Sequence, residues 1–319
     1  MRPLGRAFRL AMIRTLKRLF ALVRWLVFPQ ICFKMIKSVF AGRAKRHYGI
    51  AAFFLIAVSV FAVHAADDDD LGSTNWDKRP IEELFKTDVV YPQEKGELEV
   101  EVASLYQNQR GGDSWTAPLS LEYGLTDNWQ VESEWDSFTR HRSSDGSVAS
   151  GIGDLELGTQ YSFMNVGGSL FHIAPRFSIG IPLGNVNKEL SEGFLEYEPA
   201  VIVARDFPQL HRTQVFAEIG AGFVQRVKRP VDADDAEPAA HELNLGTGFF
   251  TLFAHGAATF EFNCNNNTWN RHGTENDLYA TPGAILRVAR NVEIGLGIPI
   301  GLNKGSDRFD VMAHVVWEF

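Results

Sequence analysis

Few side chains in this sequence have the types and spacing that covalent chemistry requires. His141 and Ser143 lie two positions apart, close enough in sequence for a base and a nucleophile. A serine activated by histidine also needs a third group to orient the imidazole, and the surrounding HRSSDG segment is typical of a solvated loop. The other histidines show no HExxH-like ligand spacing, and there is no GxGxxG or GxxxxGK(S/T) phosphate loop. We therefore expect no enzyme activity, no metal site and no cofactor.

Acidic side chains are a larger chemical feature, and they are unevenly distributed. The chain has 319 residues, with 31 Lys+Arg and 39 Asp+Glu. Residues 1–46 hold 12 of the basic residues and residues 1–65 hold no acidic one, so residues 66–319 carry a formal charge of −20. Nucleic-acid binding needs a basic footprint on the folded domain, so this balance argues against it. A content of 45% hydrophobic residues argues against disorder.

Residues 1–65 have the features of a basic leader that ends in an export signal. Three basic residues at 43–46 precede an apolar run of 15 residues at 49–63, followed by compact residues before a possible cut. The run is short for a spanning helix, which needs roughly 20 residues. We predict a signal peptide cleaved after position 65, with an uncleaved anchor as the alternative. The predicted cleavage-site residues are Val63, Ala65 and Ala66.

The segments on either side of the signal are harder to assign. Residues 1–42 are interpreted as a basic amphipathic membrane-surface helix. The alternative is that translation begins at Met35, so that residues 1–34 precede the true start. Residues 66–96, which begin with the acidic run DDDD, are predicted to be a periplasmic segment. Cys32 and Cys264 fall on opposite sides of the predicted cut, so no disulfide framework is expected.

The remainder of the chain alternates between polar and apolar residues. Residues 129–136 place Trp, Val, Ser and Trp on one face and Gln, Glu, Glu and Asp on the other. Segments of about ten residues with this period are typical of strands that cross a membrane as a barrel. The predicted strands are 97–107, 115–125, 128–138, 151–163, 170–182, 194–205, 213–226, 242–253, 257–264, 277–289, 291–301 and 309–319.

The connections between these strands alternate between long and short. Examples of the long class are 139–150 (TRHRSSDGSVAS) and 228–241 (KRPVDADDAEPAAH), whereas TDN and RN are short. An outer-membrane barrel has long loops at one end and tight turns at the other, with both termini on the turn side. A soluble sandwich has no reason to sort its loops in this way. The sequence therefore predicts an all-β fold, a transmembrane antiparallel β-barrel of about twelve strands at 97–319, with both barrel termini in the periplasm.

Strand parity places a polar and mainly acidic set of side chains inside this barrel. Such a lumen would favour cations or neutral solutes over anions, although the same side chains could instead solvate and bridge a plugged interior. The residues predicted to line the lumen are Glu132, Glu134, Asp136, Asp154, Glu156, Glu196, Glu198, Arg176, Arg226 and Arg287.

The chain ends in an alternating strand, FDVMAHVVWEF, that finishes on a phenylalanine. This ending resembles the recognition signal that bacterial outer-membrane proteins present to the barrel-assembly machinery. Trp317 and Phe319 are its predicted signal residues.

Several further motifs resemble one family. They are GIGDLELGTQYSF (151–163), VVYPQEKGELEVEVASLYQNQ (89–109), EYGLTDNWQVE (122–132), IGIPLG (179–184) and LGIPIG (296–301). Together they are similar to the MetA-pathway of phenol degradation family of bacterial outer-membrane transporters. The resemblance spans 89–319 and implies a twelve-strand barrel and a transport role. Its motifs are structural, so it identifies no substrate.

The sequence thus leaves three functions to compare. The first is an outer-membrane channel that passes a small cationic, neutral or aromatic solute. The second is a structural or adhesion barrel that binds through loops 228–241 and 264–277. The third is a lipolytic enzyme similar to outer-membrane phospholipase A, but the Asn-Gly that follows its His-x-Ser is absent, and parity places His141 and Ser143 on the lipid side. Expected partners are outer-membrane lipid and lipopolysaccharide, the assembly machinery and a small-molecule solute; the oligomeric state is open.

Overall fold

The structure is a computed structural model that describes residues 80–109, 111–210, 212–229, 231, 240–268 and 276–319. The predicted signal peptide, its cleavage site at Val63, Ala65 and Ala66, and the possible start at Met35 lie outside the described residues. Among the described residues, no helix has the length and apolar character needed to cross a membrane.

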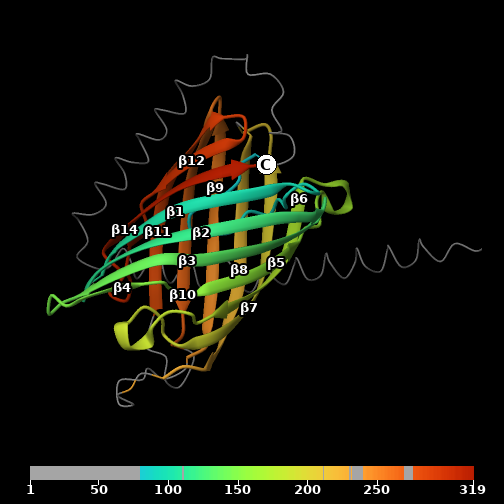
Figure 1. Cartoon of the computed structure of the whole chain (residues 1–319). Coiled ribbons are helices and arrows are strands. Elements are labelled where there is room, and N and C mark those ends of the chain that lie inside the picture. Colours follow the sequence, from blue (N-terminus) through green and yellow to red (C-terminus); the bar gives the residue numbers. More distant parts are fainter. Residues whose placement is uncertain (1–79, 110, 211, 230, 232–239, 269–275) are drawn as a thin grey trace, which may run out of the picture. The chain divides into compact units, whose positions relative to one another are not determined.

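The described chain forms a closed antiparallel β-barrel (Figure 1). Its fourteen strand segments make twelve spans, because β4 and β5 both pair with β3, and β12 and β13 both lie between β11 and β14. The strands are β1 Leu98–Asn108, β2 Gly112–Thr126, β3 Trp129–Ser143, β4 Val148–Gly151, β5 Leu155–Tyr161, β6 Phe171–Ile181, β7 Phe194–Phe207, β8 Thr213–Arg226, β9 Glu242–Phe253, β10 Gly256–Asn266, β11 Asn276–Ala289, β12 Val292–Gly297, β13 Ile300–Gly301 and β14 Phe309–Glu318. The two short 3-10 turns are η1 Val166–Gly168 and η2 Val186–Lys188.

The barrel closes where the first strand meets the last. β1 pairs with β14 from Glu99 opposite Glu318 to Asn108 opposite Phe309. Closure leaves no unpaired edge, which a membrane interior would penalise. We call the end of the barrel that holds Leu98 and Phe319 the terminal end, and the opposite end the loop end.

The strand prediction is confirmed, and the largest difference lies at the end of β3. Residues 139–150 were predicted to be a loop, but β3 continues to Ser143 and the chain returns as β4 after a tight turn. The register also shifts between Ala117 and Pro118, which pair with Phe138 and Asp136. Proline donates no ladder hydrogen bond and therefore favours a bulge at this point.

Large apolar side chains cover the outward face of the strands, among them Trp129, Phe163 and Trp317. A soluble monomer rarely exposes a contiguous apolar surface of this kind, whereas a membrane barrel presents it to lipid.

The buried apolar core lies inside the barrel rather than between two layers. Its members from the strands, such as Ile202, Phe216, Phe250 and Ile285, pack against apolar residues of the segment that precedes β1. Those residues are Ile81, Leu84, Phe85, Val89, Val90 and Tyr91. We call residues 80–96 the inserted segment.

The prediction of a periplasmic segment at 66–96 therefore needs refinement in its described part. Residues 81–93 lie inside the barrel, where the apolar side chains of this stretch are removed from water. The boundaries at 65 and 96 stay predictions.

The closing contact at the C-terminus can be tested by truncation. Phe319 and Leu98 exchange two backbone hydrogen bonds, with N···O distances of 2.8 and 3.2 Å. Deleting Phe319 removes both bonds at the closing pair and should lower the amount of heat-modifiable barrel in outer-membrane fractions several-fold. Phe319→Leu keeps the backbone and serves as the control; equal assembly of the deletion and the control would contradict a role for this closure.

Candidate functional site

The inserted segment is attached to the barrel wall by acidic side chains that accept hydrogen bonds from its backbone. Glu293 accepts from the amide of Glu82 at 3.1 Å. Glu261 accepts from the amides of Phe85 and Lys86 at 2.9 and 3.0 Å. Backbone groups enclosed without a ladder partner need such acceptors, and a carboxylate is a strong one. Carboxylates in the lumen therefore position the segment.

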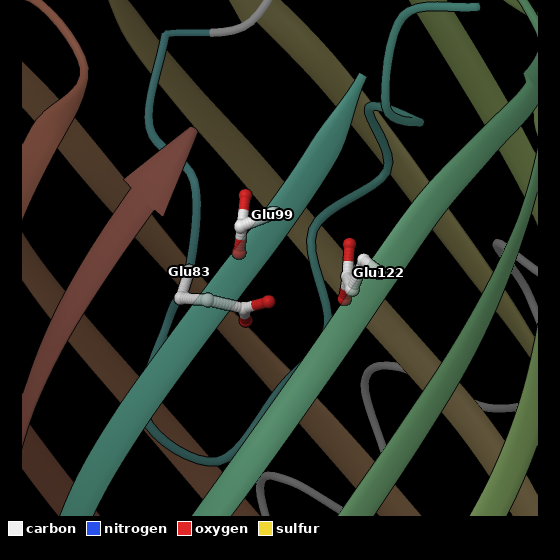
Figure 2. Close-up of side chains that lie close together, drawn as sticks. All are labelled: Glu83, Glu99 and Glu122. Carbon is white, nitrogen blue, oxygen red and sulfur yellow. The ribbon is translucent and has the colours of Figure 1, made fainter. Parts of the chain in front are cut away.

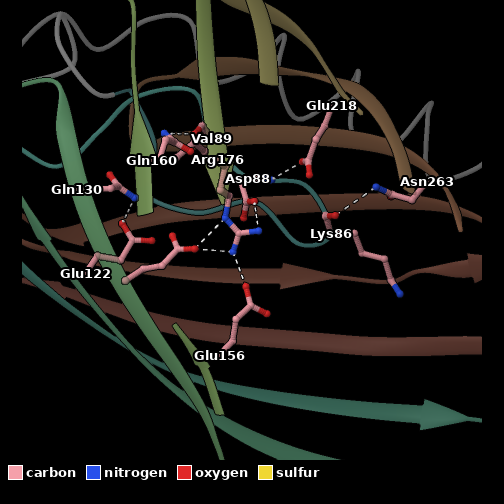
Figure 3. Close-up of polar contacts among 11 residues, drawn as sticks. Lys86, Asp88, Val89, Glu122, Gln130, Glu156, Gln160, Arg176, Glu218 and Asn263 are labelled. Carbon is pink, nitrogen blue, oxygen red and sulfur yellow. Dashed lines mark hydrogen bonds and ion pairs between the residues drawn. The ribbon is translucent and has the colours of Figure 1, made fainter. Parts of the chain in front are cut away.

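Amide side chains of the wall bond the same segment at further points. Gln130 accepts from the amide of Gln93 at 2.8 Å, and Gln160 donates to the carbonyl of Val89 at 3.1 Å. On the other side of the barrel, Asn263 donates to the Lys86 carbonyl at 3.3 Å (Figure 3). The two ends of the segment thus contact the terminal half of the barrel, and its middle reaches farther toward the loop end.

Arg176 on β6 forms the central ion-pair cluster of the lumen (Figure 3). Its guanidinium contacts Asp88 of the inserted segment at 3.0 Å, Glu132 at 2.6 Å and Glu156 at 2.8 Å. A Cβ on Gly158 would overlap the Glu132 carboxylate. Gly158, the last glycine of the GIGDLELG motif, thus leaves room for the Glu132 carboxylate to reach Arg176.

The environment of Asp88 changes its acidity. Enclosure within the barrel raises the pKa of Asp88 above its ordinary value, the Arg176 guanidinium lowers it, and Glu156 and Glu122 raise it further. The net direction of the pKa of Asp88 is upward because the effect of enclosure exceeds that of the guanidinium, which Asp88 shares with Glu132 and Glu156.

Two more polar groups hold the segment near the terminal end. Arg287 pairs with Glu293 at 2.6 Å and with Glu82 of the segment at 3.1 Å. Asp206 accepts a hydrogen bond from the Tyr91 hydroxyl at 3.0 Å and lies 2.9 Å from His172.

Glycines on β11 and β12 form a recess for the Phe85 ring. A Cβ on either Gly283 or Gly297 would overlap this ring. The ring also stacks on His314, with centroids 5.3 Å apart and planes inclined by 9°. The two glycines on neighbouring strands therefore form a recess into which the Phe85 ring of the segment packs.

One carboxylate of the inserted segment meets two of the barrel wall: Glu83, Glu99 and Glu122 each place an oxygen within 4.8 Å of the others (Figure 2). The Gln93 amide donates to Glu99 at 2.5 Å and to Glu122 at 3.1 Å. Each of the three carboxylates has further interactions, so this cluster is part of the attachment of the segment.

Three more predicted lumen residues face inward, and two of them, Glu196 and Glu198 at the start of β7, lie near the loop end. Glu134 faces inward with Gln130 and Glu132. Gly222 leaves room for the carboxylates of Glu196 and Glu198.

Asp136, Asp154 and Arg226 also lie toward the loop end. The backbone of Asp136 pairs with that of Asp154, whose side chain accepts from the amide of Gly184 at 3.0 Å and from Ser191 Oγ at 2.9 Å. Arg226 covers the Phe194 ring at 4.2 Å and donates to carbonyls of the neighbouring loop. Asp154 and Arg226 thus hold loops.

The His141–Ser143 pair does not have the geometry of a nucleophile and its base. The bulge after Asp136 turns His141 to the inside, opposite the inward-facing Ser114, so the lipid-facing assignment was wrong. Glu189 lies 3.1 Å from His141 Nε2 and 3.4 Å from Ser143 Oγ. Both groups contact the same carboxylate, whereas a relay requires the imidazole to lie between serine and acid.

The sequence analysis did not identify two important features, Glu261 and the inserted segment. Glu261 lies in TFEFNC, the shortest predicted strand, although its alternation with Thr259 and Asn263 marks it as inward. The inserted segment has no periodicity, so its only signal was an apolar content too high for a periplasmic tail.

Comparison with solved structures places the fold in a class. The structure described as the COG4313 outer membrane channel from Pseudomonas putida F1 matches with a TM-score of 0.55 and 12% identity, over 72% of this chain and 98% of that one. The NanC porin matches with a TM-score of 0.49 and 7% identity, over 68% of this chain and 98% of that one. The KdgM porin matches with a TM-score of 0.47 and 12% identity, over 69% of this chain and 99% of that one. The fold is that of a bacterial outer-membrane β-barrel.

No protein-family model matches the chain, and no curated protein matches its sequence. The resemblance to the phenol-degradation family therefore stays a prediction.

The recess for Phe85 offers a direct test of the inserted segment. Gly283→Val should expel the ring, because overpacking costs about 1–3 kcal/mol, and amide hydrogen exchange in residues 80–93 should accelerate about tenfold. Gly111→Val is the control, since a Cβ there meets nothing within 4 Å. Unchanged exchange in the Gly283 variant would show that the ring is not seated between these strands.

Proposed function

We propose that this protein is a passive channel of the bacterial outer membrane that passes a small cationic or neutral solute, and that the inserted segment closes it. The difference in bonding between wall and segment supports this most directly. The strands are joined by continuous ladders, whereas residues 80–96 are attached mainly by side chains such as Glu261, Arg176 and Asp206. Water can replace such contacts one by one, so the segment can leave while the barrel stays closed.

The charge of the loop-end lumen supports the solute class. Glu196 and Glu198 lie there, and Arg176 is already shared among three carboxylates. Rings of acidic side chains favour cations in water-filled paths. Gradients drive the passage, and the role requires no covalent chemistry.

The predicted setting of the channel is the outer membrane, with both barrel termini toward the periplasm. The likeness to a barrel described as an outer membrane channel supports this reading. A structural or adhesion barrel acting through its loops is the alternative, but it gives no use to a segment with a fitted seat in the lumen. His141 and Ser143 both contact the Glu189 carboxylate, and this arrangement disfavours a lipolytic enzyme.

Ion conductance of the full chain in a planar bilayer tests the channel. Discrete openings are expected, with a reversal potential under a KCl gradient that indicates cation preference. Glu196→Gln/Glu198→Gln should move this potential toward zero, because two carboxylates leave the path. Asp127→Asn removes an exposed carboxylate at the terminal end, outside the inserted segment, and should leave the potential unchanged. A silent bilayer with heat-modifiable barrel present would contradict the proposal.

The acidity of Asp88 predicts how pH acts on the channel. The pKa of Asp88 is raised when the segment is docked. The docked state therefore binds the proton more tightly than the released state does. Acid therefore favours closure, and raising the pH through the raised pKa favours opening. Asp88→Asn imitates the protonated form, so its open probability should stay low and vary less with pH. An Asn variant that opens more than the wild type at neutral pH would reverse this sign.

A further inference from the structure

The side chain of Lys86 ends in a cage of acidic and aromatic groups at the loop end. Its Nζ lies 4.2 Å from the centre of the Tyr279 ring and 3.6 Å from Asp310 Oδ2. Its charge also acts on Asp277 and Asp307. We call Asp277, Tyr279, Asp307 and Asp310 the Lys86 cage.

The cage is built independently of the lysine that occupies it. The Tyr279 hydroxyl accepts a hydrogen bond from the backbone amide of Asp307 at 3.0 Å, which fixes the ring. Gln107 donates to the Asp307 carboxylate at 3.4 Å. The cage joins β11, the connection after β13, and β14, none of which belongs to the inserted segment.

Asp310 indicates that Lys86 fills the cage incompletely. Its side chain is 0% exposed, and neither carboxylate oxygen accepts a hydrogen bond. The ion pair at 3.6 Å is longer than a charge-assisted hydrogen bond, which measures about 2.7–2.9 Å. Asp277 Oδ1 is also buried without a hydrogen-bond donor. These oxygens can accept donors that Lys86 does not supply from its present position.

The backbone of the inserted segment limits how far Lys86 can reach. The amide of Lys86 is held by Glu261 and its carbonyl by Asn263, both on β10. The side chain extends away from these contacts (Figure 3). A free ammonium ion has no such tether and can approach the carboxylates closely.

The chemistry of the cage selects an organic ammonium group over a metal. An ammonium carries three N–H donors, which match three carboxylates, and its charge is attracted to the face of an aromatic ring. A divalent metal is coordinated by oxygens at about 2.0–2.6 Å and gains little from a ring face.

We propose that the Lys86 cage is a binding site for a primary ammonium group of a solute, and that Lys86 occupies it as an internal competitor when the inserted segment is docked. Asp277 and Asp310 are each the second residue of a strand that begins at the loop end, and the Lys86 side chain is 23% exposed. A solute amine arriving from the loop end displaces Lys86 from the cage. Binding and docking then exclude one another, so the ligand shifts the population toward release of the segment. Arrival of the solute rests on the proposed channel, whereas binding in the cage does not.

Calorimetric titration of the full chain, purified from outer membranes in detergent, tests this assignment with n-butylammonium chloride as the probe. Lys86→Met keeps an apolar stem but removes the competing charge, so the probe should bind about tenfold more tightly than to the wild type. Adding Asp310→Asn or Tyr279→Leu to that variant should abolish the gain. Lys228→Met is the matched control, because the Lys228 ammonium donates to the carbonyls of Leu183 and Gly184 and lies outside the cage; this variant should bind the probe like the wild type. Heat-modifiable migration establishes that each variant is folded.

Three results would overturn the assignment: no gain in Lys86→Met, equal binding of 1-butanol, or displacement of the probe by Mg²⁺ at lower concentration, which would identify a metal site. Bilayer recordings separate this proposal from the channel itself. Conductance without probe binding would contradict the ammonium site and leave the channel proposal standing. Probe binding without conductance would contradict the channel and leave the ammonium site standing. With both present, n-butylammonium should raise the open probability of the wild type and leave that of Lys86→Met unchanged.

Discussion

Everything in the lumen depends on one constraint: backbone that lies inside a closed barrel without joining its ladder must find other hydrogen-bond partners. The wall meets this need with carboxylates. Glu293 and Glu261 accept the amides of the inserted segment, and Asn263 supplies a donor for one of its carbonyls. The acidic composition of the inward face is therefore first a structural requirement, and its electrostatic consequences follow from that requirement.

Two kinds of bonding hold the two parts of the molecule. The strands share continuous ladders that close from β1 to β14, so opening one strand costs many bonds together. The inserted segment is held by separate side-chain contacts and by the recess at Gly283 and Gly297. Loss of one contact leaves the others in place. This difference in bonding is what the proposed release of the segment rests on.

The sequence predicts the wall well because strand contacts are periodic and local. Alternation at 129–136 places Glu132 inward, and the same parity places Arg176 and Arg287 in the lumen, where each contacts carboxylates. On β3, parity fails beyond Asp136, because the bulge opposite Pro118 inserts an extra residue that alternation does not encode. The inserted segment could not be placed, since its partners, such as Glu261, lie far away in sequence and its own residues have no period.

The carboxylates that attach the inserted segment are also those proposed to select the solute, so closing of the channel and passage of the solute are linked. With the segment docked, Arg176 and Lys86 engage acidic groups of the lumen. In the proposed channel, release of the segment would remove Asp88 and Lys86 from the lumen, and the wall would keep its surplus of carboxylates along the path. A cation then both gains from the vacated carboxylates and hinders the return of Lys86. An anion gains neither, so the charge that holds the segment in place also sets which solutes can keep the lumen open.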